Sequence, residues 1–180
     1  MEKNNVATKV IVPCRFSYLH CWEPASVNNG ESKYSCSAII KKSDTKTVEA
    51  IKAAIEQAKK DAISKWGGKI PANLKTPLRD GSIERPDDEA YKDCYFFNAN
   101  SRQAPQVVDG KVQPILDQSE VYSGCYGRIS VTFYGYNSNG NRGVAAGLGN
   151  IQKLKDGEAL GGRSKASDEF ETVEDDDFLA

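Results

Sequence analysis

The sequence has few of the residues from which metal centres and disulfide frameworks are built. Its 180 residues include one histidine and five cysteines, and no two of the cysteines form a Cys-x-x-Cys pair. These are too few well-spaced ligands for zinc, and an intracellular chain of this size has little need of disulfides. We therefore expect no metal or cofactor, and we expect the cysteines to act as small hydrophobic residues in strands: Cys14, Cys21, Cys36, Cys94 and Cys125.

The sequence also lacks a long apolar run. No segment approaches the roughly 18 consecutive apolar residues that can cross a bilayer. Residues 1–5, Met-Glu-Lys-Asn-Asn, carry no apolar stretch of a secretory signal. We therefore expect a cytoplasmic protein that does not enter a membrane.

Motifs for catalysis are scarce. His20 with Cys21 or Cys94 could supply a base and a nucleophile, but lone residues outside a motif are weak evidence. The glycine-rich segment 140–150 does not end in Gly-Lys-Ser/Thr and opens no helix, so it fails the test for a phosphate-binding loop. Its glycines are more typical of a bend in a barrel strand or of a close backbone approach. We expect that the protein is not an enzyme.

Charge is distributed unevenly along the chain. All 24 Lys and Arg lie in residues 1–165, whereas seven of the 25 Asp and Glu lie in residues 166–180. The body therefore carries a net charge of +6 and the last segment a net charge of −7. After Gly161-Gly162 the sequence holds too few apolar residues to bury a core. We predict one folded domain over residues 1–163 and a disordered acidic tail over residues 164–180.

Hydrophobic periodicity predicts short strands around a single helix. Apolar residues step by three and four between 45 and 66, which predicts a helix that Ser43 or Asp44 can cap and Gly67-Gly68 can end. Residues 67–90 contain several prolines and no periodicity, so we expect a long loop. Alternating patterns predict strands over residues 6–19, 33–42, 91–100, 106–115 (as a hairpin), 122–136 and 143–153. The fold class is therefore mainly β, an OB-fold-like antiparallel barrel with one substantial α-helix.

Two of these strands raise the question of which aromatic side chains fill the barrel. The first strand should place Tyr18 on the same face as Val12 and Phe16. The strand over 91–100 should place Tyr91, Tyr95 and Phe97 on one face and Phe96 on the other. We expect one or two of these rings, Tyr95 among them, to contact a ligand, because a barrel needs the others in its core.

The strand over residues 126–136 carries the clearest candidate surface. Ile129, Val131 and Phe133 point one way and suit a core. The opposite face combines rings, a cation and hydroxyls, so that bases could stack while phosphates are neutralised. Tyrosines at a half-exposed barrel rim can equally place their hydroxyls in water without binding anything. The residues of that face are Tyr126, Arg128, Ser130, Thr132, Tyr134 and Tyr136.

Basic residues complete the predicted site. Residues 33–85 contain twelve Lys or Arg against six Asp or Glu. In the loop after the helix, Lys69, Lys75 and Arg79 alternate with rigid prolines, a pattern that can follow a phosphate backbone without reading sequence. Arg142, in the glycine-rich segment, is included in the site. The helix lysines are expected to be solvated only.

The acidic tail has a composition of its own. Asp175, Asp176 and Asp177 are followed by Phe178, so consecutive carboxylates end in an apolar anchor. Acidic runs are usually only solubilising. Attached to a basic body, this one could also occupy the protein's own cationic groove or bind a basic patch on a partner.

Seven stretches spread along the chain form a recognisable pattern: Lys33–Ser35, Lys42–Thr47, Lys65–Pro71, Pro77–Gly81, Tyr122–Tyr126, Gly147–Gln152 and Leu160–Arg163. With these stretches the sequence resembles, over nearly its full length, a family of phage and prophage single-stranded DNA-binding proteins, formerly a domain of unknown function. The resemblance implies an OB fold, like that of the replication protein of short-tailed coliphages, which also ends in acidic residues and an aromatic. It supplies no residue-level binding map.

Together these features favour sequence-independent binding of single-stranded DNA during phage replication or recombination, in the cytoplasm of the bacterial host. The tail would recruit other replication or recombination proteins, and a homodimer is left open. The alternative is an interaction or scaffold protein of the phage replisome, whose aromatic residues bind protein rather than DNA.

Overall fold

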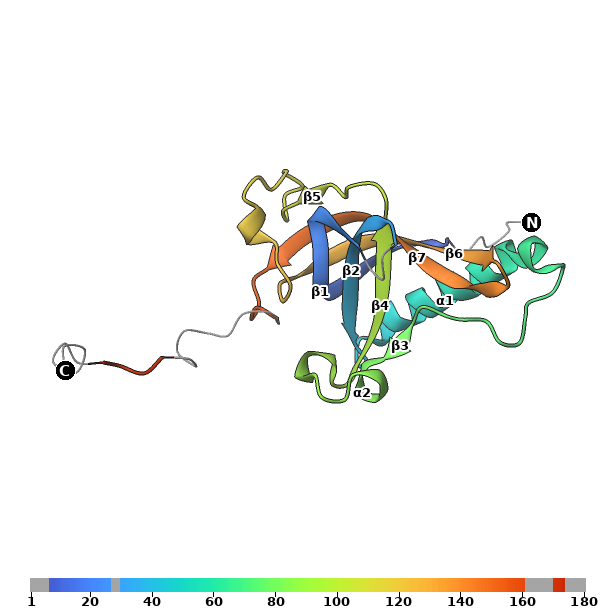
Figure 1. The fold of residues 1–180 in the computed structure, drawn as a ribbon, viewed down its shortest axis with the longest axis horizontal. Helices are drawn as coiled ribbons and strands as arrows, with labels where there is room; N and C mark the ends of the chain where they lie inside the picture. The colour runs from blue at the N-terminus through green and yellow to red at the C-terminus, as the bar shows by residue number, and fades with distance from the viewer. Residues whose placement is uncertain (1–6, 27–29, 161–169, 174–180) are drawn as a thin grey trace.

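A barrel of five strands forms the body of the protein in the computed structural model, which describes residues 7–26, 30–160 and 170–173. Its strands are β1 (Lys9–Ser26), β2 (Ser32–Lys41), β4 (Cys94–Ser101), β6 (Tyr126–Ser138) and β7 (Asn141–Lys155). Around the barrel the order is β1-β2-β4-β7-β6, and β6 returns to β1. Figure 1 shows β1, β2 and β4 side by side, with the β6–β7 hairpin next to them. The predicted OB-fold-like barrel is confirmed, although β4 pairs with β7 in parallel.

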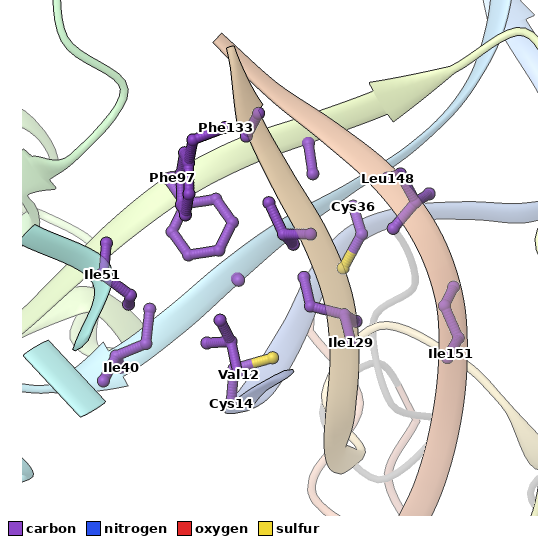
Figure 2. Close-up of a cluster of buried hydrophobic side chains, with 14 of the residues drawn as sticks. Val12, Cys14, Cys36, Ile40, Ile51, Phe97, Ile129, Phe133, Leu148 and Ile151 are labelled. Atoms are coloured by element: carbon purple, nitrogen blue, oxygen red, sulfur yellow. The ribbon is translucent and has the colours of Figure 1, made fainter. Parts of the chain in front are cut away.

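Alternating side chains from all five strands fill the barrel. Phe97 of β4 meets Phe133 of β6 edge to face, with 5.6 Å between ring centroids, and both are fully buried. Figure 2 shows these rings with Val12, Ile129 and other core residues on the strands around them. All five cysteines are free and buried, in or next to strands, as predicted.

The helix closes one end of the barrel. α1 (Thr45–Asp61) starts at Asp44, whose carboxylate accepts a hydrogen bond from the Thr47 amide, and a 3-10 turn, η1 (Ile63–Trp66), continues it to Gly67 at φ 75°. At Gly135 of β6 an added Cβ would lie 2.3 Å from the Ala62 Cβ and 2.9 Å from the Trp66 ring, so only glycine fits. The predicted helix is confirmed, and so is its buried stripe: Val48, Ile51, Ile55, Ala58, Ala62 and Trp66.

The segment 67–90 is not the structureless loop that the sequence predicts. Past residue 78 it forms β3 (Arg79–Asp80), which pairs with β4, then α2 (Gly81–Glu84) and the 3-10 turn η2 (Glu89–Tyr91). Asp80 and Asp88 cap the two turns, since their carboxylates accept the amides of Ser82 and Ala90. These elements cover the outer face of β2 and β4 at one end.

Two aromatic residues lie elsewhere than predicted. Tyr91 is in η2 rather than on a strand, and its ring packs against Phe96 in a second apolar cluster outside the barrel. Tyr18 is exposed instead of buried, because β1 shifts register against β2 between Ser17 and His20. The bulge turns Tyr18 out of the face that it would otherwise share with Phe16.

The remaining elements are short. β5 (Val107–Val108) pairs in parallel with β7, and the chain turns at Asp109 so that Val108 also bridges to Pro114, which confirms a small hairpin here. A 3-10 turn, η3 (Gln118–Glu120), precedes β6. No helix among the described residues has both the length and the apolar character to span a membrane.

Candidate nucleic-acid interface

A polar groove crosses the outer face of the barrel next to the covered apolar cluster. The register aligns one row of residues across five strands: His20 of β1, Ser35 of β2, Asn100 of β4, Gly147 of β7 and Thr132 of β6. The part over β1, β2 and β4 is a cavity of about 590 Å³ that Lys33, Ser37 and Asn98 also line. The outward residues of β2 and β4 are polar here: Lys33, Ser35, Asn98 and Asn100 reach solvent, while Ser37 is buried. Farther along the same strands the outward residues are apolar and covered.

An exposed tyrosine stands at each side of this groove. Tyr18 lines the β1 side, and this residue is 56% exposed. Tyr134 of β6 lies on the β7 side, because a Cβ added to Gly147 would be 3.5 Å from the Tyr134 ring. β1 and β7 are separated by three strand spacings, or about 14 Å around the barrel. The groove therefore has a hydrogen-bonding floor between two rings.

Residues with a small side chain or none line the β7 side of the groove. Outward positions of this strand carry Gly143, Ala145, Gly147 and Gly149. The outward side chains of β6 lie over them: the Tyr136 hydroxyl is 2.8 Å from where a Gly143 Cβ would be, and the Ser130 hydroxyl is 2.3 Å from that of Gly149. Glycine in this strand thus marks close approach, as predicted.

The charge around the groove is mainly positive. Lys33 and Arg85 line the cavity, and its one acidic residue, Glu31, forms an ion pair with Arg102 at 2.7 Å. Lys75 and Arg142 lie at the β7 rim, where the Lys75 amide donates to the Arg142 carbonyl at 3.2 Å. Such a rim can neutralise phosphates while the floor contacts bases.

Four predicted site residues meet at the β7 rim. The predicted outward face of the strand 126–136 is confirmed, because its even-numbered side chains are exposed or half-buried and its odd-numbered residues are buried. On this face Tyr134 is 44% exposed and Tyr136 is half-buried. Arg142 pairs with Asn137 on the β6–β7 hairpin, and Lys75 is bridged to Gly143. The Lys75 backbone is held by this bridge, so this part of the loop is attached to the barrel.

Tyr126 and Arg128 lie at the other end of β6. Eight residues separate Tyr126 from Tyr134, which is about 26 Å along a strand. Arg15 and Lys155 lie over the Tyr126 ring at 5.2 and 4.9 Å from its centroid. Arg128 donates twice to the Gln152 amide oxygen, at 2.9 and 2.6 Å. This end is a separate cationic cluster.

Three further predicted residues lie outside the groove. Tyr95 is half-buried against the main core, with Lys42 and Lys52 over its ring at 5.3 and 5.6 Å. Arg79 of β3 forms an ion pair with Glu84 at 2.8 Å. Lys69 is exposed in the segment between η1 and β3. The predicted tail residues, Asp175, Asp176, Asp177 and Phe178, lie outside the described residues.

Cys21 and Cys94 are poorly suited to act as nucleophiles with His20. Burial raises the pKa of the Cys21 thiol to about 12, and it also raises the pKa of Cys94. His20 is exposed while Cys21 is buried, so the neighbouring side chains do not share one site. Among the described residues no group of three or more His, Cys, Asp or Glu is arranged to hold a metal ion.

Sequence reasoning missed most of the groove. It did not single out Tyr18, Lys33, Arg85, Asn98 or Asn100 as binding residues. A signal was present, because Lys33-x-Ser35-x-Ser37 and Asn98-x-Asn100 place polar residues at alternate positions of otherwise apolar strands. Those positions face away from the core, and a surface strand without apolar cover is open to a ligand.

A family model and a protein relative each match nearly the whole chain. The family model described as "Enterobacter phage Enc34, ssDNA-binding protein" matches residues 6–179. "Putative protein p50" of Acyrthosiphon pisum secondary endosymbiont phage 1 is 33% identical over 181 aligned residues, which cover 92% of this chain and 95% of p50.

Two solved structures have a similar fold over most of the chain. The single-stranded DNA-binding protein from bacteriophage Enc34 in complex with ssDNA has a TM-score of 0.72 at 22% identity, over 89% of this chain and 97% of that chain. Bacteriophage T7 gp2.5, a single-stranded DNA-binding protein, has a TM-score of 0.58 at 16% identity, over 90% of this chain and 92% of that chain. At these identities the likeness concerns the fold.

Proposed function

Because the chain belongs to the family of the Enterobacter phage Enc34 ssDNA-binding protein, we propose that it binds single-stranded DNA during phage DNA replication or recombination. The observation that carries this proposal is the groove itself, a row of polar and glycine positions between two exposed tyrosines on a five-stranded barrel. Barrels of this fold bind oligonucleotides on the face of their second and third strands, which are β2 and β4 here.

The mechanism is stacking combined with phosphate neutralisation, without catalysis. Bases stack on Tyr18 and Tyr134, each contributing about 1–3 kcal/mol, and the amides and hydroxyls of the floor contact base edges. Lys33, Lys75 and Arg142 meet phosphates along the rim. Stacking accepts any base, so binding has little sequence preference.

We assign the DNA-binding domain to residues 1–163 and a separate role to residues 164–180. The acidic tail recruits replication or recombination partners in the host cytoplasm, and it competes with DNA for basic residues of the body. Charge supports both roles, since the body carries +6 and residues 166–180 carry −7. Tyr126 and Arg128, with Arg15 and Lys155, form an additional cationic contact for DNA that leaves the groove.

A salt titration tests the proposed function. We expect a fluorescently labelled oligonucleotide to bind with an affinity that falls with salt at a log–log slope of about −3, the value for some four phosphate contacts at roughly 0.7 each. Lys33→Ala should make the slope shallower by somewhat less than one. Lys46, on the exposed face of α1, provides the control, because Lys46→Ala should leave it unchanged. Absence of binding at low salt would favour the replisome scaffold instead.

A further inference from the structure

Tyr18 has a backbone conformation that tyrosine rarely adopts. Its φ is 44°, in the left-handed region, yet the residue is 56% exposed and gains little from burial. The residue sits at the bulge where β1 shifts register against β2. Bulges re-aim side chains, and a disfavoured backbone conformation persists only where surrounding contacts impose it. The fold therefore holds this ring in the groove at some cost.

Contacts from distant segments hold the bulge on both sides of Tyr18. The Tyr91 hydroxyl donates to the Ser17 hydroxyl at 3.0 Å, and the Leu19 amide donates to the Ser123 hydroxyl at 3.0 Å. These contacts join residues 74 and 104 positions apart in the chain. They fix the backbone before and after Tyr18, but neither touches its side chain.

Arg85 contacts the Tyr18 side chain directly. It donates from Nη1 to the Tyr18 hydroxyl at 3.3 Å, and its guanidinium carbon lies 5.0 Å from the Tyr18 ring centroid. The same guanidinium lies 4.9 Å from the Tyr91 centroid and 5.1 Å from that of Phe96. Its Nε is buried without a hydrogen-bond partner among the described residues. The ring contacts, together with the hydrogen bond to Tyr18, therefore determine where this guanidinium lies.

The backbone of Arg85 is held as firmly as its side chain. Its amide donates to the Gly81 carbonyl at 3.0 Å, at the end of α2. Gly81 is seated against the Tyr91 backbone, because an added Cβ would lie 2.5 Å from the Tyr91 carbonyl oxygen. Arg85 thus joins the buried Tyr91–Phe96 cluster to the exposed ring at the bulge.

We propose that Arg85 is a positioning residue, which holds the Tyr18 ring as a stacking platform for a nucleobase at the β1 side of the groove. This proposal rests on the proposed function. The guanidinium lies over the rings and donates to the Tyr18 hydroxyl at the same time, and a compact ammonium group does not reproduce this combination. Arg85 therefore acts on DNA through Tyr18, and its loss should affect binding of bases but not of phosphates.

A purely structural role would give a different result. If Arg85 only covered the Tyr91–Phe96 cluster, its replacement would lower thermal stability and leave stacking intact. If it contacted phosphates directly, its replacement would weaken binding of any polyanion. An oligonucleotide without bases separates these roles, because it keeps the phosphates and removes every stacking partner.

The test compares two labelled single strands of about 15 nucleotides, one of thymidines and one of abasic sites, on full-length protein. On the thymidine strand, we expect Arg85→Lys to weaken binding about 5-fold to 30-fold, within the range for losing part or all of one stacked base. On the abasic strand the change should be under about 2-fold. Arg102→Lys is the matched control, because Arg102 is an exposed arginine near the groove that pairs with Glu31 and lies over no ring among the residues that the structure describes.

A double-mutant comparison completes the test. Tyr18→Ala alone and Tyr18→Ala with Arg85→Lys should bind the thymidine strand equally, because a positioning residue has no effect once its target is gone. Additive losses, or an equal loss on both strands, would overturn the proposal. Tyr18→Phe, which removes only the hydroxyl that Arg85 contacts, should weaken thymidine binding about 2-fold to 5-fold and provides the same test if Arg85→Lys fails to fold. Failure of the unmodified protein to bind either strand would instead refute the proposed function.

Discussion

Gly147 offers a way to block the groove without removing any group that binds DNA. It lies between Asn100 of β4 and Thr132 of β6 in the row that crosses the barrel. Its φ is outside the left-handed region, so an L residue fits the backbone. An added Cβ would be 3.4 Å from the Thr132 carbonyl oxygen and 3.5 Å from the Tyr134 ring, which are ordinary contacts. A larger side chain must then extend outward, into the space above the floor.

The size of the substituent sets the expected effect. Gly147→Ala should leave stability unchanged or raise it by up to about 1 kcal/mol, as at other glycines with a compatible backbone. It should weaken DNA binding only slightly. Gly147→Leu should displace the base that lies against Tyr134, at a cost of about 1–3 kcal/mol, or roughly 5-fold to 150-fold in affinity.

Fluorescence anisotropy with a labelled oligonucleotide measures the affinity, and thermal denaturation measures stability for the same samples. Gly110→Leu is the control: it adds the same side chain at a turn near β5, where an added Cβ meets only Leu154 at 3.6 Å. If Gly147→Leu keeps its melting temperature and binds DNA as tightly as the unmodified protein, then DNA does not cross β7 and the proposed groove is wrong.

Further predictions address the rest of the chain. Tyr134→Ala should cost about 1–3 kcal/mol of binding with folding nearly unaffected, measured by the same anisotropy assay. Gly135→Ala should lower the free energy of unfolding by about 1–3 kcal/mol in a urea titration, because its Cβ would overlap Ala62. A thiol reagent at pH 8 should leave Cys21 unmodified in the native protein, since its pKa is about 12, and should react once the chain is unfolded. Deleting residues 166–180 should tighten DNA binding modestly, most at low salt; equal affinities there would leave the tail without a competitive role.

Local periodicity predicted the parts of the fold that local sequence determines. The stripe from Val48 to Trp66 and the alternation over 126–136 are both confirmed, because each reflects which face of one element meets the core. The bulge at Tyr18 could not be predicted in this way. It depends on Ser123, Tyr91 and Arg85, all at least 67 residues away in the chain.

The short elements after the helix were missed for a related reason. β3 consists of two residues, and it exists only because β4 supplies its partner. The turns that follow left a weak trace in the sequence, since Asp80 and Asp88 each cap the turn that starts after them. The prolines in this region favoured a loop over short helical turns. The sequence therefore predicted a loop for the segment that contains Arg85.

The tyrosines of the strand 126–136 show why the sequence alone does not determine which aromatic residues share one surface. The site was predicted on the strand 126–136 because this strand has the most tyrosines. In the structure these tyrosines lie at opposite ends of β6, and of the three only Tyr134 and Tyr136 border the groove. What brings them to it is the pairing of Asn100 with Gly147, a parallel contact between strands far apart in the chain. No local pattern encodes that closure. Because β7 has glycine at the contact, β6 and β4 share one continuous surface, and the predicted tyrosines join a floor of serine and asparagine that the sequence had not singled out.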